Sequence, residues 1–389
     1  MRNFEFYAPT RIVFGKDTET QVGGLLKEYG ATKVLLHFGG QSAERSGLLG
    51  RVRASLNESG VDFVELGGVV PNPRLSLVYK GIELCKKEGV DFILAVGGGS
   101  VIDSSKGIGY GLNYDGDVWD LYTKKATSNV CTPQACVLTL AAAGSEMSNS
   151  SVLTKDEGML KRSYSHDCSR LKFSILNPEL TYTLPKYQTS CGVVDIMMHT
   201  MERYFTTDEP MMMTDAIAEG VMRTAMQNGR VLMADPNNYN ARAEVMWAGS
   251  LSHNNLTQLG SNPDFATHQM EHELSGLFDV AHGAGLAALW CSWARYVCAT
   301  KPERFESFAK NVFGLEGENL ALRGIEAMED YYKEVEMPIS IPELLGRAAT
   351  EAELDEMAYK CAFEGTRSIG GFQTLDQSQI REIYVMANK

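Results

Sequence analysis

Five residues that could bind a metal ion or move a proton fall in two short segments of the chain. Asp195 and His199 stand four residues apart in CGVVDIMMHTMERY, a stretch with helical spacing. Further along, HQMEHELSGLFDVAH contains His268, His272 and His282. Residues at positions i and i+4 of a helix share one face. One carboxylate and several imidazoles gathered in this way would suit a divalent transition metal.

The spacing leaves open which metal is bound and which side chains are its ligands. The HExxH motif of zinc proteases is absent, since Glu271 stands directly before His272 in HQMEH. The usual affinity order would favour Zn²⁺ over Fe²⁺ at such a site. His37, His166 and His253 lie apart from the two segments and are interpreted as ordinary core histidines.

The composition predicts a globular protein with room for two domains. The chain has 389 residues, and a net charge of −13 without a long Lys/Arg run argues against nucleic acid as a partner. Its eight cysteines form no CxxC pair and lie in apolar segments, which predicts a reducing, cytoplasmic setting. No signal peptide is evident, and no apolar run is long enough to span a membrane.

Short apolar runs that end in small residues alternate with helix-like stretches in the first half of the chain. The runs cover residues 33–40, 61–68, 91–100 and 135–145. This alternation is typical of βαβ units in a parallel sheet. From residue 186 onward the apolar spacing is helical. The sequence therefore predicts an α/β domain over residues 1–185 and an all-α domain over residues 186–389.

The segment VGGGSVIDSSKG follows one predicted strand and opens a helix. Gly97, Gly98 and Gly99 allow a ligand to approach the backbone closely, and Ser100 adds a hydroxyl. The start of the helix offers free N–H groups and a positive dipole end to an anion. The segment therefore predicts a site for the pyrophosphate of a dinucleotide. Its spacing is not GxGxxG, and a plain βα turn is the alternative.

A second glycine loop, HFGGQSAERSG, bears on the choice of nicotinamide cofactor. Dinucleotide-binding folds place an acidic residue near such a position to bind the ribose 2′-hydroxyl. Gly39, Gly40, Gln41 and Ser42 stand there instead, with no adjacent carboxylate. A 2′-phosphate would meet amides and a hydroxyl rather than a repelling charge, so NADP(H) is favoured over NAD(H).

Together these motifs resemble those of the iron-containing alcohol dehydrogenases, most closely the NADPH-dependent butanol dehydrogenase and aldehyde reductase branch. The similarity runs over nearly the whole chain and includes FGGQS, PNP, GGGSVIDSSKG, LTLAAAGSE, NPELTYTLP, GVVDIMMHTMERYFT and ATHQMEHELSG. The resemblance implies a dehydroquinate synthase-like fold whose α/β domain binds the dinucleotide. It also implies a homodimer that interconverts small primary alcohols and aldehydes with NAD(P)H and one divalent metal, Fe²⁺ or Zn²⁺.

The resemblance also assigns individual residues. The metal ligands of the family fall on Asp195, His199, His268 and His282. A further cleft histidine falls on His272, which we expect to relay a proton or to contact the substrate. The residues that line the family's cofactor cleft fall on Gly39, Gly40, Gln41, Ser42, Asn72, Gly97, Gly98, Gly99, Ser100, Asp103, Thr139, Leu140, Lys161 and Leu180.

Three other functions have to be separated from this one. A glycerol-type polyol dehydrogenase is a related oxidoreductase. A dehydroquinate-synthase-like lyase would need a Lys/Arg cluster for a phosphorylated substrate, whereas the segments around the candidate site are apolar and rich in Met. A non-enzymatic nucleotide-binding or metal-sensing module would bind the cofactor without turnover.

Ala141 and Ala143 depart from the family pattern, in which a proline and a hydroxyl residue are common, so the metal site is implied more firmly than the cofactor site.

Overall fold

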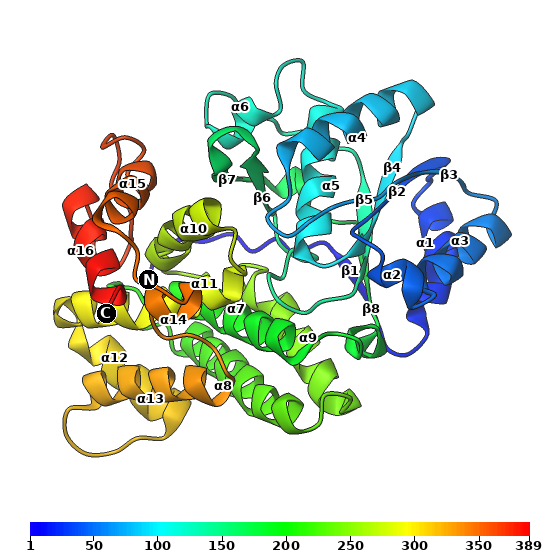
Figure 1. Cartoon of the computed structure of the whole chain (residues 1–389). Coiled ribbons are helices and arrows are strands. Elements are labelled where there is room, and N and C mark those ends of the chain that lie inside the picture. The colour runs from blue at the N-terminus through cyan, green and yellow to red at the C-terminus, as the bar shows by residue number, and fades with distance from the viewer. The chain divides into compact units, whose positions relative to one another are not determined.

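The computed structural model describes residues 1–389, which form two compact units (Figure 1). One unit comprises Tyr7–Leu184, and the other comprises Met1–Phe6 together with Pro185–Lys389. The division falls beside the predicted limits of 1–185 and 186–389, but it assigns the first six residues to the second unit.

The centre of the first unit is a six-stranded sheet in which every neighbouring pair of strands is parallel. Its order is β1-β8-β5-β4-β2-β3. The strands are β1 (Arg11–Phe14), β2 (Lys33–Phe38), β3 (Asp62–Leu66), β4 (Phe92–Gly97), β5 (Gln134–Leu138) and β8 (Phe173–Leu176). A separate antiparallel hairpin pairs β6 (Ser150–Lys155) with β7 (Leu160–Ser165). The parallel sheet confirms the predicted α/β class of this unit.

Helices cover both faces of the sheet, which explains why its central strands are apolar throughout. The helices are α1 (Val22–Glu28), α2 (Ser42–Arg45), α3 (Leu48–Glu58), α4 (Leu75–Glu88), α5 (Gly99–Gly111) and α6 (Trp119–Tyr122). Alternate strand residues point to opposite faces. Leu36 accordingly belongs to a buried cluster with α1 and α3, whereas Leu35 belongs to one with α4, α5 and α6.

The order of the strands reverses direction at β2. From β2 the chain passes to β3 on one side and then returns to β4 on the other side of β2. Ligands of open α/β sheets bind beyond the carboxyl ends of the strands at such a reversal. The loops after β2 and β4 begin at Gly39 and Gly98 respectively, so both predicted glycine loops lie at this edge.

The second unit is helical, as predicted. Its helices are α7 (Lys186–Tyr204), α8 (Met212–Ala234), α9 (Tyr239–Ser252), α10 (Ala266–Phe278), α11 (His282–Val297), α12 (Pro302–Phe313), α13 (Leu320–Glu334), α14 (Ile341–Leu345), α15 (Glu351–Cys361) and α16 (Gln377–Ala387). Both α7 and α11 are buried over most of their length, because other helices pack around them. No helix of either unit has the length and apolarity needed to cross a membrane.

Candidate metal centre and cofactor-binding loops

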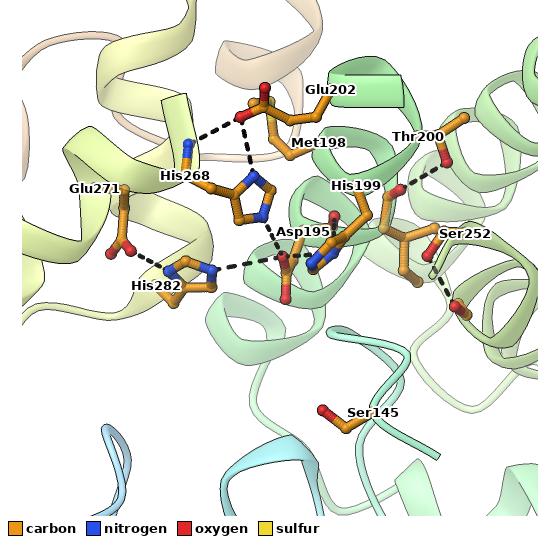
Figure 2. A network of polar contacts seen from close by, with 12 residues as sticks. Ser145, Asp195, Met198, His199, Thr200, Glu202, Ser252, His268, Glu271 and His282 are labelled. Atoms are coloured by element: carbon orange, nitrogen blue, oxygen red, sulfur yellow. Dashed lines mark hydrogen bonds and ion pairs between the residues drawn. The ribbon is translucent and has the colours of Figure 1, made fainter. Parts of the chain in front are cut away.

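Three of the predicted metal ligands converge in the helical unit (Figure 2). Asp195 comes from the middle of α7, His268 from the first turn of α10, and His282 from the first residue of α11. Each offers one donor atom, and these three atoms lie within 4.8 Å of one another. Helix packing thus brings together side chains that are up to 87 residues apart in the sequence.

The carboxylate of Asp195 lies at the centre of this group. Its Oδ1 lies 3.7 Å from Nε2 of His268 and 3.8 Å from Nε2 of His282. Oδ1 of Asp195 and Nε2 of His268 are both buried without a hydrogen-bond partner. Buried polar atoms are seldom left in this state, because an unmade interaction is costly in a low dielectric. A cation that binds both atoms would satisfy them, so the residues present fit a divalent metal.

Two buried glutamates, to which no sequence motif pointed, fix the outer nitrogens of the imidazoles (Figure 2). Glu202 accepts a hydrogen bond from Nδ1 of His268 at 3.0 Å, and Glu271 contacts Nδ1 of His282. A carboxylate partner favours a proton on Nδ1, which leaves Nε2 to face Asp195. Carboxylate–histidine–metal arrangements of this kind orient metal ligands in many proteins.

Burial and the neighbouring charges set the protonation of the group. Burial would raise the pKa of Asp195, but His199 and His282 outweigh it and hold that pKa well below its ordinary value. Burial lowers the pKa of His199 to about 4. Burial also disfavours a charged His268, yet its interactions with Asp195 and Glu202 raise its pKa to about 9. Near neutral pH, Asp195 is therefore ionised and His199 neutral, as metal binding requires, whereas His268 holds a proton that a bound cation would displace.

The remaining histidines of the site lie around these three ligands. Nδ1 of His199 lies 3.1 Å from Oδ1 of Asp195 and 3.0 Å from the carbonyl oxygen of Asp195, so His199 adjoins the group. The ring of His272 lies 5.9 Å from that of His282. His253, which the sequence suggested was an ordinary core residue, instead places its ring 4.0 Å from that of His199. Its isolated position in the sequence gave no signal of this contact.

The first unit brings the predicted pyrophosphate loop against the segment after β5. The Thr139 N–H donates to the carbonyl oxygen of Gly97 at 3.1 Å. A Cβ atom at Gly98 would lie 3.1 Å from Cβ of Leu140, and one at Gly99 would lie 3.1 Å from Cβ of Ala143. Larger residues would therefore force the two segments apart.

The start of α5 is the place where an anion-binding site was predicted. Gly98 is the N-cap residue and has no side chain to cap the first N–H groups of the helix. These groups, with Ser100 in the first turn, lie beyond the end of β4 at the topological reversal of the sheet. Gly39, Gly40, Gln41 and Ser42 lie beyond the end of the neighbouring strand β2, where α2 begins.

The other predicted cofactor residues have structural roles of their own in the first unit. Asp103 is buried and accepts hydrogen bonds from Oγ of Ser145 at 2.9 Å and from the Val152 N–H at 3.0 Å. Asn72 is buried with a positive φ of 54°. Lys161 is buried on β7, and Leu180 packs against the core beside α1 and α3.

Lys106 is a buried residue of this region whose role the sequence did not reveal. Its Nζ donates to the carbonyl oxygens of Ser145, Ser148 and Ser150 at 2.8–2.9 Å. Burial lowers its pKa to about 8. The three bonds fix the backbone between β5 and β6, which includes the segment that faces the pyrophosphate loop.

Comparisons with known proteins agree with this architecture. Residues 9–178 match the family model "Iron-containing alcohol dehydrogenase", and residues 189–388 match "Fe-containing alcohol dehydrogenase family, C-terminal". The NADH-dependent butanol dehydrogenase A of Clostridium acetobutylicum is 38% identical over 389 residues, which cover 99% of each chain. The NADPH-dependent aldehyde reductase of Escherichia coli is 37% identical over 298 residues, or 75% of this chain and 76% of that one.

A solved structure extends the agreement to three dimensions. The crystal structure of NADH-dependent butanol dehydrogenase A from Thermotoga maritima superposes with a TM-score of 0.96 at 38% identity, and the match covers 100% of this chain and 99% of that one. The family models together span both units of the structure. The chain therefore belongs to the iron-containing alcohol dehydrogenase family, which confirms the resemblance of its motifs.

Proposed function

We propose that this protein is a metal-dependent, NAD(P)H-linked enzyme that interconverts small primary alcohols and aldehydes of the butanol and butanal type. The observation that carries the proposal is the convergence of Asp195, His268 and His282 with two buried, unsatisfied ligand atoms. Relatives named as butanol dehydrogenases and as an aldehyde reductase support the substrate class.

The proposed metal ligands are Asp195, His199, His268 and His282, and the proposed metal is Fe²⁺ or Zn²⁺. When bound, the cation supplies Lewis-acid polarisation of a carbonyl oxygen, and the nicotinamide supplies or accepts the hydride. Glu202 and Glu271 hold two of the imidazoles with their Nε2 atoms toward Asp195. The proximity of the His272 ring to His282 supports a role for His272 in relaying a proton to the alkoxide oxygen or in contacting the substrate.

The first unit is the proposed cofactor-binding domain. The uncapped start of α5 would receive the pyrophosphate, with Gly97, Gly98, Gly99 and Ser100 forming the loop. The other proposed cofactor residues lie around the same end of the sheet or support its loops; they are Gly39, Gly40, Gln41, Ser42, Asn72, Asp103, Thr139, Leu140, Lys161 and Leu180.

NADP(H) is the proposed preference, because no carboxylate follows β2 within Gly39–Ser42. The relatives carry names of both cofactor types, so the preference rests on this loop. A Gly39→Asp substitution tests it: its Cβ would meet only the carbonyl oxygen of Val69 at 3.4 Å and a methyl group of Val101 at 3.8 Å. We expect the ratio of NADPH to NADH affinity to fall about tenfold or more through repulsion of the 2′-phosphate.

The control for this change is Gly24→Asp, which adds the same charge on α1, where a Cβ meets nothing within 4 Å. Binding is measured by nicotinamide fluorescence for both cofactors. An unchanged ratio in Gly39→Asp would remove the basis for the NADP(H) preference.

The assembly and cellular setting are further parts of the proposal. The large apolar side chains exposed near the N-terminus include Phe4, Phe6, Tyr7 and Phe14, and β1 is an edge strand. In the proposed homodimer, a second copy of the chain covers these side chains. Light scattering tests this by measuring the molar mass of the wild-type protein and of Phe6→Ser. No disulfide bond joins any of the eight cysteines, which supports a reducing, cytoplasmic compartment.

The experiment that tests the substrate class compares aldehydes and ketones under identical conditions. We expect butanal to be reduced with a higher kcat/KM than dihydroxyacetone, because the proposed substrate is a small monofunctional aldehyde. A higher kcat/KM for the polyol-type ketone would favour the glycerol-type alternative. Tight cofactor binding without turnover of either compound would favour a lyase or a non-enzymatic module.

A further inference from the structure

His253 lies against the metal centre, although the metal-binding segments of the sequence do not include it. It is the C-cap residue of α9, and its ring centroid lies 4.0 Å from that of His199 with an angle of 32° between the ring planes. The ring of His199 also lies 4.4 Å from the ring of His268. His199 therefore has an imidazole neighbour within the ligand group and another from α9.

The position of His253 is well defined by its surroundings. Nη1 of Arg242 on α9 donates to Oγ1 of Thr189 on α7 at 2.9 Å, which ties the two helices together. After His253 the chain turns sharply: the Leu256 N–H donates to Oδ1 of Asn254 at 3.0 Å, and Asn255 has a positive φ of 75°. These contacts hold α9 against α7, which carries His199, and define the turn that follows His253.

The ring of His199 makes its polar contacts through Nδ1. This atom meets the carbonyl oxygen of Asp195 at 3.0 Å and lies 3.1 Å from Oδ1 of the same residue. Rotation about the terminal torsion of a histidine is soft. His268 and His282 each have a glutamate on Nδ1 to set their planes, whereas Nδ1 of His199 faces Asp195 itself.

We propose that His253 is a positioning residue that fixes the ring plane of His199 by ring contact, in the role that Glu202 and Glu271 have for the other two imidazoles. The inference rests on the proposed function, since it takes His199 to be a metal ligand. Packed aromatic rings favour one arrangement over others by roughly two- to tenfold. His253 acts through its ring face and not as a ligand.

The test measures metal affinity directly, by competition of Co²⁺ with a chromophoric chelator, and records the visible spectrum of the Co²⁺ protein. We expect His253→Ala to weaken Co²⁺ binding roughly two- to tenfold and to change the spectrum. His253→Phe, which keeps a ring and removes both nitrogens, should restore both. Trp247→Ala, at an exposed residue of the same helix, is the control for general loosening of α9.

Two results would overturn the inference. The first is wild-type affinity and spectrum in His253→Ala. The second is a His253→Phe protein as weak as His253→Ala, which would show that the nitrogens of His253 matter and that it binds the metal itself. Circular dichroism of each variant identifies any that fail to fold. If His253→Ala fails to fold, His253→Phe keeps the test decisive.

A comparison with His199→Ala distinguishes failure of the proposed function from failure of this inference. His199→Ala should weaken Co²⁺ binding more than His253→Ala, and the double variant should lose little beyond His199→Ala, because the two residues act as one unit. Unchanged affinity in His199→Ala would overturn the ligand assignment and the inference together. A loss in His199→Ala without one in His253→Ala would overturn the inference alone.

Discussion

Glu202 receives two hydrogen bonds from His268, one from the backbone N–H at 2.8 Å and one from ring Nδ1 at 3.0 Å. The pair joins α7 to the first turn of α10, so the helix that carries Asp195 also sets the position and the tautomer of a proposed ligand on another helix. The carboxylate of Glu202 is buried, and its charge stabilises the imidazole it holds. Positioning of the proposed metal ligands is thus part of the packing of the helical unit.

Replacing Glu202 is expected to weaken metal binding without removing a ligand. Glu202→Gln keeps the shape but loses the charge, and we expect a loss of about tenfold in metal affinity; Glu202→Ala should lose up to about 100-fold. The measurement is chelator competition with Zn²⁺. Glu209→Gln, at an exposed residue of the following loop, is the control and should bind as the wild type does. Equal affinity in Glu202→Ala and the wild type would contradict the role given to Glu202.

Asp195→Asn should abolish the stabilisation that a metal gives to the fold. A metal that binds only the native state raises the free energy of unfolding by about 2.7 kcal/mol when its concentration is about 100 times Kd. We therefore expect added Zn²⁺ to raise the thermal unfolding midpoint of the wild type and to leave that of Asp195→Asn unchanged. A metal-dependent rise of the same size in both proteins would place the cation elsewhere.

Enlarging the pyrophosphate loop should weaken cofactor binding. In Gly99→Ala the new methyl group would lie 3.1 Å from Cβ of Ala143 and 3.4 Å from Oγ of Ser145, so the facing segment must shift by a few tenths of an ångström. We expect NADPH affinity to fall about tenfold, in line with the usual cost of overpacking. Gly24→Ala on α1, where a Cβ meets nothing within 4 Å, is the matched control. Wild-type affinity in Gly99→Ala would argue against this loop as the binding site.

His37 should make the stability of the first unit depend on pH in the acidic range. It is fully buried on β2; Nδ1 contacts the carbonyl oxygen of Leu66 at 2.8 Å and Nε2 contacts Oγ of Ser104 at 2.9 Å. Burial lowers its pKa from 6.5 to about 4. Between these two values the unfolded chain binds a proton that the folded chain excludes, so stability falls as the pH falls.

The size of this effect is about 1.4 kcal/mol per pH unit within the window. Urea unfolding of the first unit between about pH 7 and pH 4.5 should therefore show a shallower loss of stability in His37→Leu than in the wild type. His166→Leu, in the same unit, serves as the control for removal of a histidine. Parallel pH profiles in His37→Leu and the wild type would show that His37 becomes protonated in the folded state.

The fold class was predictable because its strongest signals are local. The run FILAVG of β4 is buried along its whole length, and the helical spacing after residue 186 is continuous. The β6–β7 hairpin was missed, because strands such as LKRSYS are rich in polar residues and pack little apolar surface. Within the apolar run 135–145, β5 extends only to Leu138, and Thr139–Ser145 is a loop that packs against the glycine turn.

The candidate site was predictable only where residue type and spacing combine. Asp195 and His268 are conspicuous because each has a second potential ligand four residues away. Glu202 and Glu271 are ordinary in sequence, and their contacts with histidines of other helices or turns depend on packing that no local pattern specifies. The ring contact of His253 and the burial of Lys106 were not predicted for the same reason, since both depend on neighbours that are distant in the chain.

The metal dependence of butanal reduction tests the proposed function most directly. Protein stripped by a chelator under anaerobic conditions is assayed by the decay of NADPH absorbance, before and after addition of one equivalent of Fe²⁺ or Zn²⁺. We predict no turnover in the stripped protein, recovery on addition of metal, and no recovery in His268→Ala. Full turnover by the stripped protein, or wild-type activity and metal content in His268→Ala, would contradict a metal centre at Asp195, His199, His268 and His282.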